Sequence, residues 1–386
     1  MKHNILFISS WYPTKYNPTL GNFVFKHAEC VSKNNQVRAI HICLDSNITQ
    51  NDLDFTEIPF PSKVIYLKKS TFPIVGKLID NIRIIKTYLE EYNLLIKEGF
   101  TPDLVHANVV FPIGIIAWIY HRKFNINYVI SEHWTGYHEY ADPRPGFIQR
   151  CIIRFVANRA KAILPVSDDL GKAMIRHNIT SKIITVANVI DTNLFSPILE
   201  LKKDEIIRII HISTLENIQK NINLLLEAFA TVSQQNSNLE LHIISDGNLN
   251  DFKLQIENLG IASKIVNHGR LDTQEVADVL KQAYFFVLTS NFENLPCVLI
   301  ESISCGVPVI ATNVGGVSEI INKNNGIIIE PRQMEELVNA MGEMIEKHNS
   351  YDKVLLHKMA AENYSYEAIG NQLTQIYQQV LSTQKD

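Results

Sequence analysis

Two carboxylates in the segment 290–319 have a spacing that suits the binding of a phosphate-bearing ligand. Glu293 and Glu301 are eight residues apart. If a helix begins near Leu295, this separation is about two helical turns and places both carboxylates toward one side of the helix. Glu293 then lies in the loop at the helix N-terminus. Because a helix N-terminus at the carboxyl edge of a parallel sheet binds phosphate, the segment predicts such a site.

A glutamate pair at this spacing is more often part of a solvated helix face, so the flanking residues decide between the two interpretations. A Cys-Gly-Val-Pro turn at 305–308 follows the predicted helix, and an apolar strand then leads to Gly315 and Gly316. This order of helix, turn, strand and double glycine favours a binding site. Lys220 is a second candidate, because it lies between a strand and an amphipathic helix.

Short apolar runs alternate with helical patterns along most of the chain. The segments 78–97, 223–234 and 274–282 have apolar residues at the spacing of a helix. This alternation predicts parallel, doubly wound sheets, and two such domains, because the predicted strands are too many for one ordinary open sheet. Those strands are 5–9, 37–43, 64–67, 104–106, 128–131, 162–166, 183–186, 207–212, 239–245, 265–267, 285–289, 307–312 and 326–329.

The composition indicates a soluble globular protein with a sizeable core. Of its 386 residues, 46% are hydrophobic and 20% charged. A net charge of −4 excludes a polycation that binds nucleic acid. The five cysteines include no C-x-x-C pair, so a disulfide framework or zinc site is not expected. The apolar run 5–8 is too short for a signal peptide, and the run 109–120 is too short to span a membrane. A cytoplasmic protein is therefore expected.

Other phosphate-binding or metal-binding motifs are missing or weak. The first strand ends without a G-x-G-x-x-G turn, and there is no G-x-x-x-x-G-K-[ST] sequence. The pair Asp52 and Asp54 forms a D-x-D, which can hold the metal of a sugar nucleotide. Because this pair lies in a polar, loop-like stretch, we interpret it as structural. The sequence therefore predicts no metal site.

The segment 290–319 resembles the E-x7-E donor motif of family 4 glycosyltransferases, which are retaining enzymes with the GT-B architecture. The agreement extends along nearly the whole chain. The matching segments are Gly21–Phe23, Asp103–His106, Ser131–His133, Val166–Ser167, Asn188–Asp191, Lys220, Ser245–Gly247 and His268–Leu271. The resemblance implies an α/β fold of the GT-B type, with two doubly wound Rossmann-like domains whose parallel sheets face a central cleft.

The resemblance also implies a role for individual residues. Glu293 would bind the hydroxyls of the donor sugar, Lys220 would neutralise the diphosphate as the sugar leaves, and His133 would contact the reacting centre. Glu301 would hold the ribose hydroxyls, and Gly21 would let its loop approach the phosphates. The remaining donor-binding candidates are Ser213, Thr214, Arg270, Leu271, Asn294, Leu295 and Cys297, and two further candidates are His106 and Asp246. His106 is as well explained as a histidine satisfied at a strand end, and Asp246 as part of a turn.

The sequence departs from the family pattern at three positions. The usual G-R-L before the phosphate lysine is replaced by Ser213, Thr214 and Leu215, so the arginine that partners this lysine is absent. A hydroxyl of Ser213 or Thr214 could donate to phosphate instead, without charge. Asn221 follows the lysine, and Asn294 follows the first glutamate, where the family commonly has glycine.

From these observations we expect two domains and one reaction. Residues 1–192, with a C-terminal helix 366–386, would form the acceptor-binding domain, and residues 193–365 the nucleotide-sugar donor domain. The protein would transfer a hexose-type sugar from a nucleoside diphosphate to an acceptor hydroxyl with retention, without metal or cofactor, in bacterial polysaccharide or glycoconjugate synthesis. The alternatives are a GT-B nucleotide-sugar epimerase and a non-catalytic nucleotide-sugar-binding protein.

The charge is divided unevenly along the chain and predicts a partner for the first half. Residues 1–190 carry 22 basic against 15 acidic side chains, and residues 191–386 carry 14 against 25. Within the first half, residues 144–182 hold eight basic side chains against two aspartates. We expect this region either to be a solvated surface or to bind an anionic membrane. In the second case the protein is peripheral on the inner face of the cell membrane, with a carbohydrate or lipid-linked acceptor.

Overall fold

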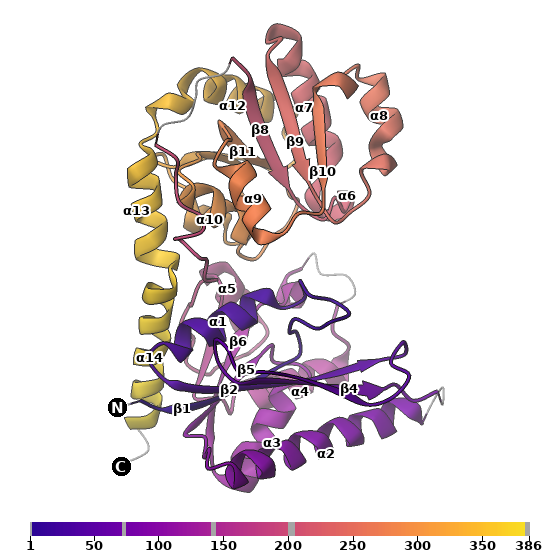
Figure 1. Ribbon diagram of the computed structural model, residues 1–386, viewed down its shortest axis with the longest axis vertical. Helices are drawn as coiled ribbons and strands as arrows, with labels where there is room; N and C mark the ends of the chain where they lie inside the picture. Colours follow the sequence, from indigo (N-terminus) through magenta and orange to yellow (C-terminus); the bar gives the residue numbers. More distant parts are fainter. Residues whose placement is uncertain (1, 72–74, 140–143, 200–204, 383–386) are drawn as a thin grey trace. The chain divides into compact units, whose positions relative to one another are not determined.

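The computed structural model describes residues 2–71, 75–139, 144–199 and 205–382 (Figure 1). Contacts divide the chain into two compact units. Unit 1 comprises Met1–Val189 and Tyr366–Asp386, and unit 2 comprises Ile190–Ser365. Each unit is an α/β body built on its own mainly parallel sheet.

The described residues of unit 1 form a seven-stranded sheet in the order β3-β4-β2-β1-β5-β6-β7. All neighbouring strands are parallel except β3, which pairs antiparallel with β4 at one edge. The strands are β1 (Asn4–Ser9), β2 (Gln36–Asp45), β3 (Asp52–Thr56), β4 (Ser62–Lys68), β5 (Leu104–Asn108), β6 (Asn127–Glu132) and β7 (Ala162–Pro165).

Helices cover both faces of this sheet. On one face, α1 and α14 contact each other, and their apolar side chains share a core with β1 and β2. Figure 1 shows α2 and α3 on the opposite face, and α4 packs against α3. The helices are α1 (Asn22–Ser32), α2 (Gly76–Lys97), α3 (Gly114–Phe124), η1 (Thr135–Tyr137), α4 (Phe147–Ala157), α5 (Asp168–Arg176) and α14 (Tyr366–Ser382). The last four residues of the expected C-terminal helix, 383–386, lie outside the described residues.

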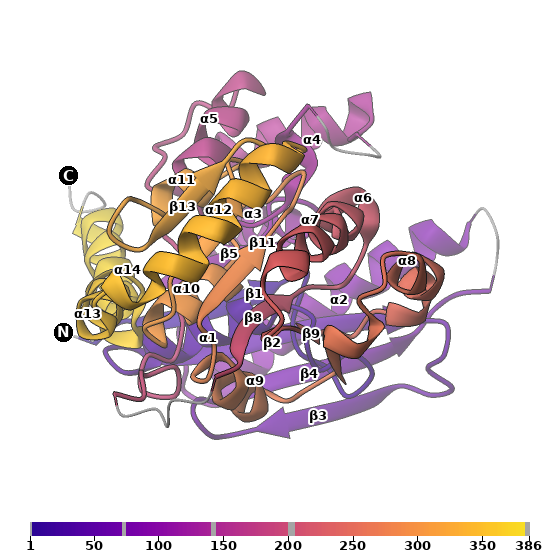
Figure 2. The ribbon, with the colours of Figure 1, turned by 90° about the horizontal axis from the view of Figure 1, so that it is seen from above.

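The described residues of unit 2 form a six-stranded parallel sheet in the order β10-β9-β8-β11-β12-β13. The strands are β8 (Ile207–Ile212), β9 (Leu239–Ile244), β10 (Ile265–Gly269), β11 (Phe285–Leu288), β12 (Val309–Thr312) and β13 (Gly326–Ile329). Helices α7 (Ile222–Gln235) and α12 (Met334–Lys347) lie side by side over one face, as Figure 2 shows, and close the core.

The other helices of unit 2 include two that carry or support the candidate site. Helix α10 (Cys297–Ser304) contacts β11 and β12 and packs against α13 (Lys353–Tyr364), and α6 (Asn217–Lys220) precedes α7. The remaining elements are η2 (Leu249–Phe252), α8 (Lys253–Asn258), η3 (Ala262–Lys264), α9 (Thr273–Leu280), α11 (Val317–Ile320) and η4 (His348–Ser350).

Two sequence-based predictions of strands were wrong. The segment 183–186 makes an isolated bridge between Ile183 and Ile163 and is not a strand of the sheet. The stretch with Asp52 and Asp54, expected to be a loop, is the edge strand β3. Four of the five residues of β3 are exposed, so this strand lacks the apolar run by which the buried strands were recognised.

Each sheet has a position where the strand order reverses, and binding residues are expected there. In unit 1, β2 lies on one side of β1 and β5 on the other. In unit 2, β9 lies on one side of β8 and β11 on the other. Ligands of open α/β sheets bind outside the carboxyl ends of the strands at such a point. The loops after β1, β5, β8 and β11 are therefore the positions at which candidate side chains can meet a ligand.

Buried histidines make unit 1 sensitive to acid. Burial lowers the pKa of both His27 and His41 to about 4. In the unfolded chain these two histidines take up protons near pH 6.5. The unfolding free energy is therefore undiminished above that pH and declines as the pH falls toward 4. At pH 5 each histidine costs about 2 kcal/mol of unfolding free energy.

Urea unfolding at pH 7 and pH 5 measures this loss. Fluorescence reports on unit 1, because all three tryptophans, Trp11, Trp118 and Trp134, lie there. We expect a lower midpoint at pH 5, and a difference in unfolding free energy that is smaller by about 2 kcal/mol in a His41→Gln variant. Equal unfolding free energies at the two pH values contradict the prediction.

Candidate active site

A buried ion pair lies at the carboxyl edge of the unit 2 sheet. The Nζ atom of Lys220 is 2.5 Å from Oε1 of Glu293, and the two side chains are 14% and 9% exposed. The same carboxylate oxygen accepts a hydrogen bond of 2.7 Å from the hydroxyl of Ser290. Sequence reasoning named both members of this pair, and the structure brings them together across 73 residues of chain.

The loop after β11 holds the short helix that carries Lys220. The hydroxyl of Thr289 donates to the carbonyl oxygens of Lys220 and Asn221, at 2.9 and 3.2 Å. Two residues on, the side chain of Asn291 donates to the carbonyl of Ile218 at 2.8 Å, and its backbone N–H donates to the carbonyl of Gln219. Lys220 and Glu293 are therefore fixed relative to each other by the backbone as well as by their charges.

The double glycine after β12 supports the loop of Glu293 from the other side. Gly315 has a φ of +54°, and a Cβ atom at this position would lie 1.9 Å from the carbonyl oxygen of Glu293. The N–H of Gly316 donates to the carbonyl of Asn294 at 2.7 Å. Only glycine permits this close approach, which explains the glycine at position 315.

The second glutamate lies inside the helix, as the spacing predicts. Glu293 is in the loop before α10, and Glu301 is the fifth residue of this helix and is half-buried. The loop residue Leu295 is buried, and Cys297 begins the helix. Pro296 precedes the first helical residue, so the N–H groups at the helix N-terminus begin with that of Cys297.

The hydroxyl of Ser213 is directed into the protein, contrary to the expectation that it could donate to a phosphate. His211 must donate from Nδ1 to the carbonyl of Val287, 2.9 Å away, because a carbonyl only accepts. Burial lowers the pKa of His211 to about 4, so Nε2 is unprotonated and accepts the proton of Ser213 at 2.7 Å. The Ser213 oxygen also accepts from the N–H of Leu215. Thr214, which is exposed, is left as the hydroxyl that faces outward.

The donor-binding candidates Arg270 and Leu271 and the further candidate Asp246 lie at the carboxyl ends of β9 and β10. Arg270 and Leu271 directly follow β10, and Asp246 is exposed in the turn after β9. The hydroxyl of Ser245 accepts from the N–H of Gly247 at 2.7 Å, which closes that turn. A Cβ atom on Gly247 would lie 2.1 Å from the carbonyl oxygen of Thr214, so the loops after β8 and β9 are in close contact.

In unit 1, His133 follows β6 and lies among other rings. Its ring centroid is 4.3 Å from that of Phe23 and 5.7 Å from that of His27. Burial first, and then the neighbouring histidines His27 and His106, hold the pKa of His133 well below its usual value. His133 is therefore neutral near pH 7, and it can exchange hydrogen bonds with a sugar but carries no charge.

The neighbouring residue Glu132 positions the loop that carries His133. Its carboxylate accepts from the N–H groups of Val110, His133 and Trp134, each at 2.9 Å, and from the hydroxyl of Tyr137 at 3.1 Å. Burial raises the pKa of Glu132, and these four hydrogen bonds oppose the shift. Sequence reasoning gave Glu132 no role, although its place between a strand end and a histidine was available as a signal.

His106 is a structural histidine in this arrangement. Its Nδ1 lies 2.6 Å from the hydroxyl of Tyr377 in α14, and its Nε2 lies 2.8 Å from the hydroxyl of Ser131. The side chain is fully buried with both ring nitrogens in hydrogen bonds. It joins α14 to the sheet of unit 1.

Asn108, two residues after His106, differs from it in hydrogen bonding. Its side chain is fully buried at the carboxyl end of β5, and neither its oxygen nor its nitrogen has a hydrogen-bond partner among the described residues. The hydroxyl of Ser10, at the end of β1, is likewise buried without a partner in the described part of the chain. Because such groups are costly to bury, they mark the point of strand reversal in unit 1 as a polar site.

Gly21 is required by packing within unit 1. It has a φ of +68° at the N-terminus of α1, and a Cβ atom would lie 2.4 Å from the carbonyl carbon of Trp11. The glycine thus lets α1 begin directly against the loop after β1. This contact accounts for the glycine within the protein itself, whatever it does toward a phosphate.

Two family models match the chain and together cover most of it. The model described as glycosyltransferase family 4 matches residues 59–194, and the model described as glycosyl transferases group 1 matches residues 195–359. The chain belongs to the family 4 glycosyltransferases. It is therefore a glycosyltransferase, and the change from one model to the next falls close to the division between the two units.

Individual relatives of this glycosyltransferase agree with the assignment. An uncharacterized glycosyltransferase of Methanocaldococcus jannaschii is 25% identical over 355 residues, which cover 91% of this chain and 90% of that protein. The N-acetyl-alpha-D-glucosaminyl L-malate synthase of Bacillus anthracis is 26% identical over 301 residues, covering 74% and 76%.

Solved structures share its fold. HepE of Anabaena, in complex with UDP, superposes with a TM-score of 0.73 at 17% identity and covers 98% of this chain and 100% of its own. At this identity the likeness concerns the fold alone. The expected GT-B architecture, with two parallel-sheet α/β domains, is confirmed.

An arginine that sequence reasoning missed lies beside the loop after β11 of this glycosyltransferase. Arg332 follows β13 with a φ of +65°, and its Nε donates to the side-chain oxygen of Asn291 at 3.0 Å. Asn291 in turn holds the helix of Lys220. No local signal marks either residue, because each acts through a contact between distant loops.

The described residues contain no group of three or more His, Cys, Asp or Glu side chains arranged to hold a metal ion. The D-x-D on β3 is engaged elsewhere: Asp52 pairs with Lys15, and Asp54 accepts from the hydroxyl of Tyr66 at 2.6 Å. Within the described ranges, no helix is long and apolar enough to cross a membrane.

Proposed function

We propose that this glycosyltransferase moves a hexose-type sugar from a nucleoside-diphosphate-sugar to an acceptor hydroxyl with retention at the anomeric carbon. The observation that carries the proposal is the buried Lys220–Glu293 pair at the carboxyl edge of the unit 2 sheet. A carboxylate can hold sugar hydroxyls, and the adjacent ammonium can hold the diphosphate. Unit 2 is then the donor domain, and unit 1 the acceptor domain.

The proposed step occurs on one face of the sugar. The bond between the anomeric carbon and the diphosphate oxygen breaks, and the acceptor oxygen bonds to the same carbon. The acceptor proton passes to the departing phosphate, whose negative charge Lys220 stabilises. No metal takes part in this scheme, because Lys220 supplies the positive charge that a metal would otherwise bring.

Several residues support the two substrates in this scheme. Glu301 accepts hydrogen bonds from the ribose hydroxyls. His133, a residue of unit 1, contacts the sugar as a neutral ring. The backbone near Arg270 and Leu271 faces the base. We place the reaction in bacterial polysaccharide or glycoconjugate synthesis, on a carbohydrate or lipid-linked acceptor, with the protein peripheral on the inner face of the membrane.

A screen of UDP-, GDP- and dTDP-sugars tests the proposal. Thermal shift identifies the bound nucleotide, because a ligand at 100 times its dissociation constant adds about 2.7 kcal/mol to stability. With that donor we expect transfer to a carbohydrate acceptor, an unchanged anomeric configuration by proton NMR, and full activity after treatment with EDTA. Inversion, or a strict requirement for a divalent cation, contradicts the corresponding part of the mechanism.

The same screen separates the two alternative functions. A nucleotide-sugar epimerase of this fold releases free sugar and nucleotide when no acceptor is present. A non-catalytic binding protein shows a thermal shift with the nucleotide sugar but leaves it intact. Either result overturns transfer as the function while leaving the location of the nucleotide site to be tested separately.

A further inference from the structure

Helix α4 of unit 1 has apolar side chains on both of its opposite faces. Ile153 and Val156 are buried against the protein. At about 100° per residue, Phe147, Ile148 and Phe155 lie on the other side of the helix, where the ring of Phe155 packs edge-on against Trp118 of α3 at a centroid distance of 5.2 Å. Their exposed fractions are 74%, 73% and 40%. A surface helix normally presents polar side chains on its outer face, so the outer face of α4 is suited to a non-aqueous surrounding.

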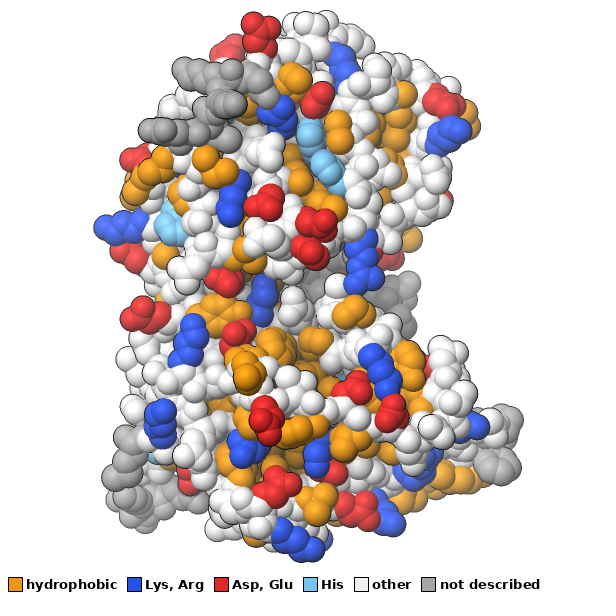
Figure 3. All heavy atoms as spheres, in the orientation of Figure 1, with side chains coloured by type: hydrophobic (Ala, Val, Ile, Leu, Met, Phe, Trp, Pro, Cys, Tyr) orange, Lys and Arg blue, Asp and Glu red, His pale blue; other side chains and the backbone are white. Residues whose placement is uncertain are grey.

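The chain segment that carries this apolar face is basic. Between residues 144 and 167 there are five basic and no acidic side chains. All five are exposed: Arg144, Arg150, Arg154, Arg159 and Lys161. The guanidinium carbon of Arg159 lies 3.7 Å from the ring centroid of Phe155, which places a positive charge at the edge of the apolar face. On the face of unit 1 that Figure 3 shows, basic and acidic side chains are interspersed.

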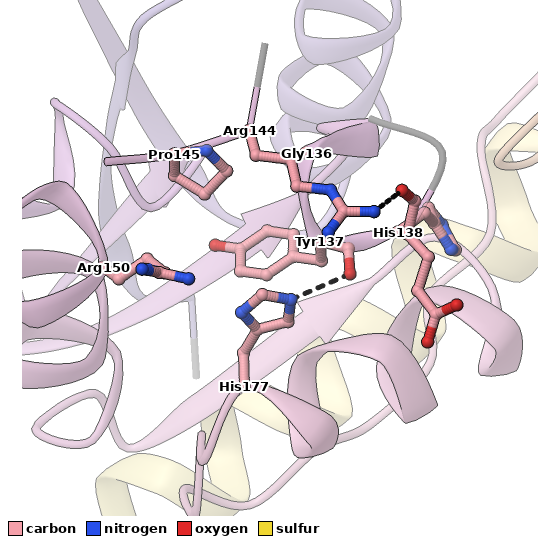
Figure 4. A pocket seen from close by; sticks show the side chains of 8 residues that line it. Gly136, Tyr137, His138, Arg144, Pro145, Arg150 and His177 are labelled. Carbon is pink, nitrogen blue, oxygen red and sulfur yellow. Dashed lines mark hydrogen bonds between the residues drawn. The ribbon is translucent and has the colours of Figure 1, made fainter. Parts of the chain in front are cut away.

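A cavity of about 90 Å³ opens beside the first turn of α4. Its lining residues include Arg144, Arg150, Tyr137, His177 and one acidic residue, Glu139, and Figure 4 shows Arg144, Arg150 and His177 around the ring of Tyr137. His177 binds the carbonyl of Tyr137 at 3.0 Å, and Arg144 donates to the carbonyl of Glu139. In the part of the chain that the structure describes, no carboxylate pairs with Arg150. The cavity therefore offers cationic donors to an anion.

We propose that unit 1 docks on an anionic phospholipid bilayer through the outer face of α4. Phe147 and Ile148 enter the interface between headgroups and acyl chains. The adjacent cavity, between Arg144 and Arg150, takes the phosphate of one lipid headgroup. Apolar side chains beside basic ones bind such a bilayer by burial and by attraction together.

The charge complementarity selects a bilayer over other occupants of this face. A second copy of unit 1 would bring the same five positive charges against these, which opposes a dimer through α4. A bilayer of anionic lipid supplies both the phosphate for the cavity and the apolar layer for the two side chains. The inference specifies α4 within the basic region 144–182 and goes beyond the proposed transfer reaction.

Co-sedimentation of the full chain with vesicles tests the proposal. Vesicles of phosphatidylcholine alone are compared with vesicles that also contain phosphatidylglycerol, at low and high salt and without sugar nucleotide. We expect binding only to the anionic vesicles, reduced by salt. A Phe147→Ser/Ile148→Ser variant should bind about tenfold more weakly or less. Arg150→Gln should bind about fivefold more weakly.

Matched substitutions on α8 of unit 2 serve as controls. Leu254 is 71% exposed, like Ile148, and the neighbouring Lys253 has a side chain that is 70% exposed. Leu254→Ser and Lys253→Gln should bind as the wild type does. Inorganic phosphate should weaken the binding of the wild type more than chloride of equal ionic strength, and this excess effect should vanish in Arg150→Gln.

Three results overturn the proposal. The first is equal or absent binding of the wild type to the two kinds of vesicle. The second is binding by the α4 variants that equals that of the wild type. This includes the case in which binding is lost only in a Leu78→Ser/Ile82→Ser variant, which replaces exposed apolar side chains of α2. The third is a dimer of the wild type, by light scattering, that the Phe147→Ser/Ile148→Ser variant dissolves. Because no sugar is present, none of these results bears on the transfer reaction.

Discussion

A Glu293→Gln variant is expected to lose sugar transfer while keeping its fold. Glutamine has the shape of glutamate and can still accept the hydrogen bond from Ser290, 2.7 Å away in the wild type. It lacks the charge that orients Lys220 and that strengthens contacts with the sugar hydroxyls. Loss of one such contact in a transition state lowers kcat about a hundredfold to a thousandfold. Single-turnover transfer with the donor from the screen measures this loss.

The same variant is expected to be less stable than the wild type. The Lys220 side chain is 14% exposed and loses its counter-ion, which costs about 1–3 kcal/mol of unfolding free energy. The thermal midpoint should fall accordingly, and circular dichroism at room temperature should match the wild type. Glu335→Gln, at an exposed position in the first turn of α12, controls for loss of a glutamate and should change neither quantity. Wild-type turnover of Glu293→Gln would show that the donor sugar binds elsewhere.

The parts of the fold that the sequence predicts are those in which burial leaves a local pattern. Strands such as Ile207–Ile212 are apolar runs because helices cover both faces of a parallel sheet. The edge strand β3 has no such run, and 183–186 has the run without the pairing. An apolar run thus predicts that a segment is buried. The buried segment is a strand only where a neighbouring strand pairs with it.

The site divides in the same way between local and distant information. The spacing of Glu293 and Glu301 and the glycines after them are local, and the structure shows the geometry behind each. The direction of the Ser213 proton depends on His211, and the tautomer of His211 depends on a carbonyl in β11, so the sequence could not reveal it. Asn291 and Arg332 meet across 41 residues of chain, and a single sequence carries no mark of that contact.

The departure at Ser213 makes Lys220 more important than the family pattern alone suggests. The family places an arginine next to the phosphate lysine, and this chain has Thr214 there instead. The structure removes Ser213 as a substitute donor, because its proton is held by His211. Arg332 approaches the loop after β11 but is bound to Asn291 through Nε. The positive charge at the proposed diphosphate position therefore comes mainly from Lys220.

A Lys220→Met variant is accordingly expected to lose both transfer and tight binding of the nucleoside diphosphate. Methionine keeps most of the length of the side chain without its charge. A hydrogen bond to a charged group contributes about 1.5–3 kcal/mol, so binding should weaken about tenfold to a hundredfold by titration calorimetry. Lys220→Arg keeps the charge but changes its geometry, and it should recover part of the binding and little of the transfer.

Combining the two substitutions separates a catalytic lysine from a merely structural one. If Lys220 serves only to neutralise Glu293, then Lys220→Met is harmful because it leaves a buried carboxylate unpaired. Adding Glu293→Gln would then restore both stability and nucleotide binding. If Lys220 holds the diphosphate, the double variant regains stability, because no charge is left unpaired, but nucleotide binding stays as weak as in Lys220→Met. Recovery of binding in the double variant would therefore reduce Lys220 to a partner of Glu293 and move the diphosphate to another cation.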